Sequence, residues 1–258
     1  MIDAPYEYHK AKRNFNMNPT SPLNQIRVVL SHTSHPGNIG AAARAMKTMG
    51  LSQLYLLNPK KFPHADADDR ATGAIDLLER AQVCTELDQA FQGCVLVAGV
   101  TARRRDLSHK MVSVREGAEQ LVKESATGPV ALFFGTEMSG LTNAELDKCQ
   151  LLITIPANPE FSSLNLASAV QIVAYELRMA TALGAFTDVN EHEPATFEEL
   201  EYFYTHLEKV VIDVNFLDPT HPRRMMQRLR RMFSRVRMEK NEVDILRGIL
   251  SMIEQKTK

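Results

Sequence analysis

The chain has 258 residues, of which 44 % are hydrophobic and 24 % are charged, a composition typical of a globular protein with a real core. Its formal net charge is −1, so the chain as a whole shows no excess of positive charge for nucleic acid, and local charge must be examined instead. No apolar run approaches the roughly 20 residues needed to cross a bilayer, which argues against a membrane protein.

The N-terminal stretch and the cysteines indicate where the protein works. Residues 1–24 contain Pro, Asn and charged residues without a hydrophobic signal core, so we expect a flexible tail. Cys84, Cys94 and Cys149 are few, odd in number and outside any metal-ligand spacing. We therefore expect them to be reduced and mostly buried, as in a cytoplasmic protein.

Residues 25–183 alternate between two patterns. Apolar runs predict strands over residues 26–31, 54–57, 94–100, 130–134 and 151–155. Helices are predicted from the turn at 34–38 to Gly50, over 73–81, around 112–124, in a short piece from Thr142, and from Leu164 onwards. Residues 59–70 are polar and are expected to be irregular. Strands that alternate with helices predict an α/β domain with a mostly parallel sheet.

The C-terminal quarter of the chain has a different character. Residues 184–195 are acidic and loop-like, which predicts a linker. Residues 196–258 lack strand signals and predict helices over 196–211, 222–237 and 241–255. Such a short extension buries little surface by itself, so we expect it to dock on the α/β domain or on a second subunit.

Several enzyme classes lack support. The chain has no G-x-G-x-x-G after a strand, no Walker-type G-x-x-x-x-G-K, no H-E-x-x-H and no G-x-S-x-G. His32 and His35 form an isolated pair on a turn, which is more typical of ordinary loop residues than of a metal site. We expect no metal.

Two loops that follow predicted strands carry candidate residues. In the first, Asn38 can cap the following helix and Arg44 projects about two turns later, although a lone arginine on a helix is usually a solvated residue. In the second, GTEMSGL from Gly135, the glycines either allow close approach of a ligand or form a turn. Glu137 either binds a ligand or caps backbone amides, and the residues leave both interpretations open.

A third stretch, residues 151–183, has the clearest pattern. Its strand is followed by Pro156 and Pro159, which forbid both ladder and helix, and then by Ser162 and Ser163, which can cap the next helix. One apolar helix face is predicted from Leu166, Val170, Val173, Ala174 and Leu177. A polar loop between strand and helix can hold a ligand at the carboxyl edge of a parallel sheet, but the pattern does not name the ligand.

Taken together, the three stretches are much more specific. N-x-G-x-x-x-R-A at 38–45, L-x-F-G-x-E-x-x-G-L at 132–141 and I-P-x-x-x-x-x-S-S-L-N-L-A-S-A at 155–169 resemble, in order, the three motifs of the SpoU branch of SPOUT RNA 2′-O-methyltransferases. The resemblance covers roughly residues 25–183, and the motifs show no departure that would suggest lost activity. The C-terminal helices, including HPRRMMQRLRRMFSR and NEVDILRGIL, are similar to the extension of the TrmJ subgroup.

The resemblance implies a fold, a reaction and partners. It implies an α/β fold with a C-terminal trefoil knot, which base rates alone would argue against. It also implies a homodimer that uses S-adenosyl-L-methionine to methylate tRNA. The TrmJ subgroup methylates the ribose 2′-hydroxyl of nucleotide 32, a cytidine or uridine, in the anticodon loop.

Site residues follow from the same resemblance. It implies that the methyl donor is bound by Val100, Thr101, Ala102, Gly135, Ile155, Ser162, Ser163 and Leu164. SpoU-type schemes make the first-motif arginine, here Arg44, the activator of the 2′-hydroxyl. An arginine stays protonated at neutral pH, so we interpret Arg44 as holding the adjacent phosphate and stabilising the developing alkoxide. Ser163 and Asn165 are expected to orient the nucleotide or the loop.

Two basic stretches fit RNA binding. Arg103, Arg104 and Arg105 follow a predicted strand directly, next to the expected donor loop. Residues 221–237 carry seven arginines and no acid. In a helix, one face would present Arg224, Arg228, Arg231 and Arg235 to phosphates, and another would dock through Met225, Leu229, Met232 and Val236. The alternative is that the arginines pair with the acidic segment 198–201.

Three other functions remain as alternatives. A SpoU-type enzyme could act on ribosomal RNA or on another tRNA position, and only the C-terminal resemblance favours the anticodon loop. A catalytically silent RNA-binding homologue is disfavoured by the intact motifs. An unrelated doubly wound nucleotide enzyme is disfavoured by the absence of phosphate-binding motifs.

Overall fold

The computed structural model describes residues 21–102, 111–182 and 193–257. Within these residues the strands form one seven-stranded sheet in the order β3-β2-β1-β6-β4-β7-β5, and every pairing is parallel. The strands are β1 (Ile26–Ser31), β2 (Gln53–Leu57), β3 (Gln82–Cys84), β4 (Leu96–Val100), β5 (Met111–Ser113), β6 (Val130–Phe134) and β7 (Leu151–Thr154). The parallel α/β architecture expected from the sequence is confirmed.

Helices occupy the connections and the C-terminal part of the chain. Those of the sheet domain are α1 (Pro36–Met49), α2 (Ala65–Ala71), α3 (Ile75–Glu79), α4 (Leu87–Phe91), α5 (Val114–Glu124), α6 (Asn143–Leu146) and α7 (Leu166–Ala182). The helical extension consists of α8 (Phe197–Asp213), α9 (Met225–Ser234) and α10 (Lys240–Thr257). Two short 3₁₀ helices, Pro22–Gln25 and Thr72–Ala74, complete the described elements.

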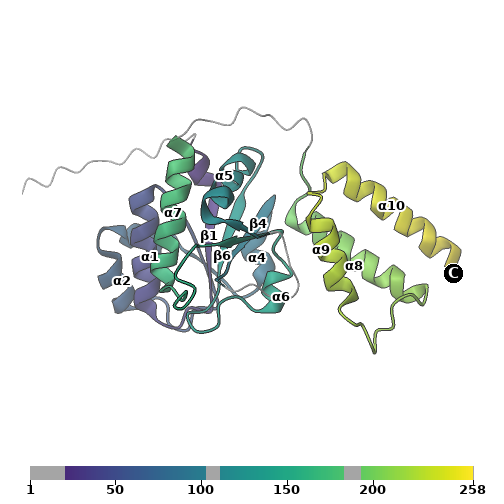
Figure 1. Cartoon of the computed structure of the whole chain (residues 1–258), viewed down its shortest axis with the longest axis horizontal. Coiled ribbons are helices and arrows are strands. Elements are labelled where there is room, and N and C mark those ends of the chain that lie inside the picture. The colour runs from purple at the N-terminus through teal and green to yellow at the C-terminus, as the bar shows by residue number, and fades with distance from the viewer. Residues whose placement is uncertain (1–20, 103–110, 183–192, 258) are drawn as a thin grey trace, which may run out of the picture.

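Apolar residues cover both faces of the sheet, as a parallel sheet requires. Successive residues of β6 belong to opposite core clusters, with Leu132 on the side of α1, α5 and α7 and Phe133 on the side of α4 and α6. Figure 1 shows α1 and α7 side by side on one face. Because β1, β6 and β4 are buried on both sides, their carboxyl ends are held rigidly, and the candidate site lies there.

The glycine of the first motif, Gly40, has a packing role. A Cβ built on Gly40 would lie 1.9 Å from the carbonyl oxygen of Ala67, in helix α2. Only glycine permits this approach of α1 to α2. The motif therefore contains a residue that shapes the layer behind the site rather than the site itself.

The structure corrects several sequence-based expectations. The segment 59–70 is not wholly irregular, because α2 begins at Ala65 with the ring of His64 accepting from the amide of Asp66. The helix predicted over 73–81 is a 3₁₀ turn followed by the shorter α3. Strands β3 and β5 and helix α4 were not predicted, since three- and five-residue elements leave almost no periodicity to detect.

The folded cores also include residues that were expected to belong to the tail and to the linker. Leu23, which falls in the expected flexible tail, is 1 % exposed and belongs to the main core cluster. Residues 1–20 lie outside the described residues, as do 183–192 of the linker. Ala195, at the end of the linker, is buried against the helical extension. The three cysteines are buried and free, as expected.

The helical extension packs on the sheet domain, as expected for a unit with a small core of its own. The ring of Phe197, at the start of α8, meets that of Phe91 edge to face at 5.4 Å, and Phe91 meets Phe133 in the same way at 5.1 Å. Each fully buried phenyl ring stabilises the fold by about 1.5–3 kcal/mol. Among the described helices, none is long and apolar enough to cross a membrane.

Candidate active site

A cavity of about 200 Å³ opens at the carboxyl ends of β4, β6 and β7. Three loops line it, one after each of these strands. All eight residues predicted to bind the methyl donor are in its lining: Val100, Thr101, Ala102, Gly135, Ile155, Ser162, Ser163 and Leu164. The structure therefore gathers residues that are up to 64 positions apart (164 − 100) in one place.

The loop after β6 is closed tightly on itself. Thr136 and Gly140 exchange backbone hydrogen bonds of 3.2 and 3.0 Å, and Gly140 has a φ of +68°, in the left-handed region. A Cβ on Gly135 would lie 2.1 Å from the carbonyl carbon of Gly140. Both glycines are therefore required by the turn itself. This turn forms one wall of the cavity.

Glu137 fastens this turn to the loop after β1. Its carboxylate accepts hydrogen bonds from the amide and hydroxyl of Ser34, the amide of His35 and the side-chain amide of Asn38, at 3.0–3.2 Å. The structure thus shows Glu137 capping backbone amides, while the residue also lines the cavity.

These contacts also set the charge of Glu137. Burial acts to raise the pKa of this carboxyl, but the hydrogen bonds from Asn38, from the backbone of Ser34 and His35 and from its own backbone outweigh it and lower the pKa to about 2. Glu137 is therefore an anion at neutral pH, and its charge is already satisfied by the protein.

Asn165 joins the third loop to the same frame. Its side-chain amide donates to the Oδ1 of Asn38 at 3.0 Å, while its own Oδ1 accepts from the amide of Ala167 at 2.9 Å. Glu137, Asn38 and Asn165 thus form a continuous chain of hydrogen bonds across the three motifs. This chain was not predicted, because it depends on how three distant loops meet.

The helix caps differ from those predicted. The cap of α1 is His35, whose Nδ1 accepts from the amide of Gly37 at 3.1 Å, so Asn38 is not the cap. Helix α7 begins at Leu166, with Asn165 accepting from its first amides, so Ser162 and Ser163 are not caps either. Asn38 is instead bound to Glu137 and Asn165, and Ser162 and Ser163 line the cavity. The predicted apolar face of α7, by contrast, is buried as expected.

The three residues predicted to be catalytic occupy different places. Ser163 lines the cavity, whereas Arg44 and Asn165 do not. Arg44 is exposed on α1, and among the described residues its guanidinium has no ion-pair partner. An exposed guanidinium without an ion-pair partner, on the helix that also carries Asn38, is available to an anionic ligand.

The two histidines of the first loop also have roles in the protein. The Nδ1 of His32 lies 2.8 Å from the hydroxyl of Ser31, which in turn donates to the carboxylate of Glu145 at 2.6 Å. His35 is the α1 cap. Within the described residues no group of three or more His, Cys, Asp or Glu side chains could hold a metal ion.

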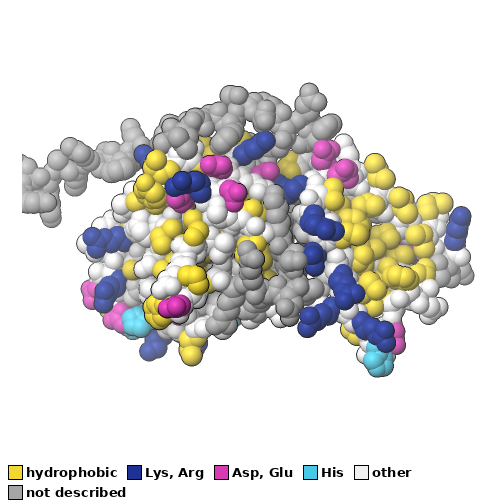
Figure 2. Space-filling model, viewed as in Figure 1, with side chains coloured by type: hydrophobic (Ala, Val, Ile, Leu, Met, Phe, Trp, Pro, Cys, Tyr) yellow, Lys and Arg dark blue, Asp and Glu magenta, His cyan; other side chains and the backbone are white. Residues whose placement is uncertain are grey.

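Helix α9 presents the predicted arginines, but its docking face differs from the expected one. Arg224, Arg228 and Arg235 are exposed and Arg231 is half-buried, and none of the four pairs with an acid among the described residues. In Figure 2 the Lys and Arg side chains gather over α9, on its side towards the sheet domain. Arg103, Arg104 and Arg105 lie outside the described residues.

The predicted apolar stripe is only partly covered, since Met225 and Leu229 are half-buried, and α9 docks through Phe233. Its ring meets that of Phe203 edge to face at 5.0 Å, whereas Met232 and Val236 are 43 % and 63 % exposed. The helix ends at Ser234 instead of residue 237, so Arg235 and Val236 lie beyond the helix faces that were predicted to carry them. The ion pair with the acidic segment does exist, but Arg230 makes it, with Glu201.

Comparison with known proteins agrees with this geometry. The family described as SpoU rRNA Methylase matches residues 25–175, which include all three motifs. The chain belongs to the SpoU methylase family. A second family, described as tRNA methyltransferase TrmJ, C-terminal domain, matches residues 198–258, so the chain falls within the TrmJ group of that family.

Relatives of this SpoU methylase cover nearly its full length. A tRNA (cytidine/uridine/adenosine-2′-O-)-methyltransferase TrmJ of Pseudomonas aeruginosa is 50 % identical over 89 % of the chain and 93 % of the relative. A tRNA (cytidine/uridine-2′-O-)-methyltransferase TrmJ of Salmonella typhimurium is 49 % identical, over 92 % and 99 %. The crystal structure of TrmJ from Z. mobilis superposes with a TM-score of 0.78 at 32 % identity, covering 88 % of the chain and 98 % of that structure.

Proposed function

We propose that the protein transfers a methyl group from S-adenosyl-L-methionine to a ribose 2′-hydroxyl of tRNA, at cytidine or uridine 32 of the anticodon loop. The observation that carries the proposal is the cavity lined by the second and third SpoU motifs and joined to the first through Asn38, in a chain about half identical to curated TrmJ enzymes. The names of these relatives support tRNA and the 2′-oxygen. The choice of nucleotide 32 rests on the resemblance to the TrmJ subgroup.

The cavity fits the methyl donor chemically. Val100, Ile155 and Leu164 provide apolar side chains for a flat purine ring, and the surrounding loops offer backbone groups to its polar edge. No phosphate cradle is needed, because this donor has no phosphate. When bound, S-adenosyl-L-methionine supplies an electrophilic methyl group on a positively charged sulfur.

The protein's own residues would then position the nucleotide. In our proposal, Arg44 holds a phosphate next to the target ribose and stabilises negative charge as the 2′-oxygen attacks. Ser163, in the cavity lining, orients the ribose, while Asn165 keeps the third loop in place through Asn38. Holding the two reactants in line contributes strongly to the rate.

We further propose a homodimer formed through the face that carries α1 and α7. Tyr175 and Met179 on α7 are 48 % and 40 % exposed, which is unusual for large apolar side chains on a helix that packs beside α1. Arg44 lies on α1. Light scattering of the purified chain tests the dimer, and Tyr175→Asp should shift it towards monomer.

We also keep the division of the chain as a proposal. It consists of a tail that ends before Pro22, a methyltransferase domain from there to residue 183, a linker from residue 184 that ends before Ala195, and a helical extension from Ala195 onwards. Limited proteolysis should cut first within the linker.

The decisive experiment is nucleoside mass spectrometry of tRNA from a deletion strain, mapped to position. We expect the 2′-O-methyl group of nucleotide 32 to disappear and to return when purified protein and methyl donor are added. Loss of a 2′-O-methyl group elsewhere in tRNA, or in ribosomal RNA, would overturn the substrate assignment. Failure of any methyl transfer to bulk tRNA would instead indicate a non-catalytic RNA-binding homologue.

A further inference from the structure

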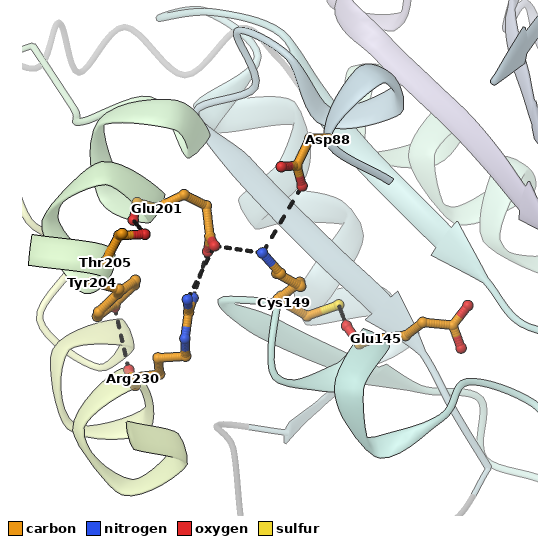
Figure 3. A network of polar contacts seen from close by, with 8 residues as sticks. Asp88, Glu145, Cys149, Glu201, Tyr204, Thr205 and Arg230 are labelled. Atoms are coloured by element: carbon orange, nitrogen blue, oxygen red, sulfur yellow. Dashed lines mark hydrogen bonds and ion pairs between the residues drawn. The ribbon is translucent and has the colours of Figure 1, made fainter. Parts of the chain in front are cut away.

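A cluster of three charged side chains joins the helical extension to the sheet domain. Glu201, on α8, accepts hydrogen bonds from both terminal nitrogens of Arg230, at 2.5 and 3.0 Å, and another from the Nζ of Lys148. Lys148 lies in the turn between α6 and β7. The three side chains are only 18–27 % exposed. Figure 3 shows Arg230 and Glu201 pointing towards one another from neighbouring helices.

On the side of the extension, Arg230 holds α9 by more than its charge. Its guanidinium lies over the ring of Tyr204, 4.3 Å from the ring centre, and the hydroxyl of Tyr204 donates to its carbonyl oxygen at 3.4 Å. The fork of an arginine binds a carboxylate in a defined orientation, so the cluster fixes the direction of α9 as well as its distance.

On the side of the sheet domain, Lys148 belongs to a short segment that also contacts the site. Its backbone amide donates to the carbonyl oxygen of Glu145 at 3.2 Å. The carboxylate of Glu145 accepts from Ser31, the last residue of β1, at 2.6 Å. The loop that follows Ser31 carries the residues bound by Glu137. One segment therefore contacts both the extension and the strand that leads into the first motif.

The electrostatics agree with a tight cluster. Burial by itself would raise the pKa of Glu201, but the hydrogen bonds and charges of Arg230 and Lys148 outweigh it, and the pKa is lowered. Buried ion pairs of this kind contribute little net stability compared with apolar residues of similar size. Their effect lies in the single geometry that satisfies all three groups.

We propose that Glu201 and Lys148 are positioning residues that hold the arginine helix α9 at a set place relative to the cavity, so that a tRNA bound to α9 presents one ribose to the methyl donor. This inference rests on the proposed function. Phe197 already fixes the start of α8 on the sheet domain, and Arg237, which follows α9, pairs with Glu124 of α5 at 2.6 Å. The cluster, one helical turn after Phe197, adds a contact to α9 itself and so sets the direction of that helix. A loosened extension would still bind tRNA but would hold the ribose in line less often.

The kinetic test compares two variants that each replace one ion-paired lysine by methionine; Lys148 pairs with Glu201 and, at 3.9 Å, with Asp88 of the sheet domain. Lys148→Met removes the ion pair of the cluster that joins the two units, whereas Lys209→Met breaks the pair with Glu254, at 2.7 Å, which lies wholly within the extension. We expect Lys148→Met to lower kcat for tRNA methylation about tenfold, because small misplacements of reacting groups have effects of this size or larger. Donor affinity and the salt dependence of tRNA binding should not change. Lys209→Met should stay within about twofold of the parent, and Lys148→Arg should recover most of the lost rate.

A distance measurement tests the same inference without activity. Spin labels on Asp69→Cys in α2 and Met232→Cys in α9, both exposed, report the separation of the two units, and the native cysteines are buried. Labelled chains are diluted with unlabelled ones so that distances between copies do not contribute. We expect a narrow distribution in the parent and in Lys209→Met, and a broader one in Lys148→Met and Glu201→Gln.

The outcomes separate the two proposals. An unchanged kcat in Lys148→Met, or an unchanged distance distribution, would overturn the positioning role. If the parent chain methylates no tRNA, the proposed function fails, and the distance distribution still decides whether the cluster positions α9. Thermal unfolding is followed in parallel, because a loss of kcat that simply tracks a lower Tm would assign the cluster a structural role only.

Discussion

Charged and polar side chains that frame the cavity are hydrogen-bonded within the protein, whereas several arginines of the α9 region have no acidic partner among the described residues. In the loops, Glu137 is bound by three residues of the protein, and Asn38 and Asn165 bind each other. On α9 and directly after it, Arg228 and Arg235 are exposed and have no acidic partner among the described residues. A satisfied network is a frame that holds its shape before any ligand arrives, whereas unpaired cations are available to phosphates. We therefore interpret the loops as the part that keeps the shape of the site, and the arginines of α9 as the part that attracts phosphates.

Arg44 should show the largest effect, because it is the unpaired cation nearest to the frame in sequence. We expect Arg44→Ala to lower kcat by about 100- to 1000-fold, the usual loss when a group that stabilises developing charge is removed. The protein should fold normally, since the side chain is exposed. Single-turnover methylation of tRNA measures the effect. If Arg44→Lys kept near-full turnover with unchanged tRNA affinity, the specific role of the guanidinium would be wrong.

Glu137→Gln should break the frame itself. Removing a charged acceptor from several hydrogen bonds is expected to lower the free energy of unfolding by about 1–3 kcal/mol, and donor affinity should fall with it. Chemical denaturation and calorimetric titration measure these two quantities. Glu160→Gln, an exposed carboxyl of the third loop, is the matched control and should change neither.

The same residue predicts how stability depends on pH. The pKa of Glu137 is about 2 in the folded chain and near 4.5 in the unfolded one, so the unfolded state binds the proton more readily. Its contribution is therefore fully present above about pH 4.5 and is lost as the pH falls towards 2. The free energy of unfolding, measured by denaturation at a series of pH values across this window, should change more steeply with pH in the parent than in Glu137→Gln. Identical slopes would count against an ionised Glu137.

Replacing arginines of α9 should affect binding rather than chemistry. We expect Arg228→Gln with Arg235→Gln to weaken tRNA binding several-fold and to reduce the slope of log affinity against log salt by about 0.7 for each lost phosphate contact. Turnover at saturating tRNA should change little. Arg80→Gln, an exposed arginine paired with Asp76, is the control. An unchanged salt dependence would remove α9 from the RNA interface.

The smallest expected effect distinguishes the observed cap of α7, Asn165, from the predicted caps Ser162 and Ser163. Asn165→Ala removes the side chain that accepts from the first amides of α7 and should lower the free energy of unfolding by about 1 kcal/mol. Ser162→Ala should leave it nearly unchanged, because that hydroxyl is not a cap in the structure. Thermal unfolding of both variants measures the difference. Equal losses would restore the serines as caps.

Local pattern was enough to predict a large part of the molecule. Buried strands such as Val130–Phe134 and the apolar face of α7 follow from residue spacing, because periodicity records which side of an element meets the core. The motif resemblance supplied the eight lining residues and the ligand they are proposed to hold. Short elements such as β3 and α4 were missed because they contain too few residues to show a period.

Tertiary structure alone decided which polar groups meet. Asn38, Glu137 and Asn165 each looked like a local cap or an isolated candidate. Only the folded sheet brings them into one hydrogen-bond network, in which Asn38 and Asn165 are 127 residues apart in the chain. The same holds for Arg230, which lay outside the predicted RNA face, and for its link through Glu201 to Lys148. Hydrogen bonds and ion pairs between distant segments leave no period in the chain, because their partners are chosen by the packing of whole elements. The sequence thus determined where the site lies, and the fold determined how it is held.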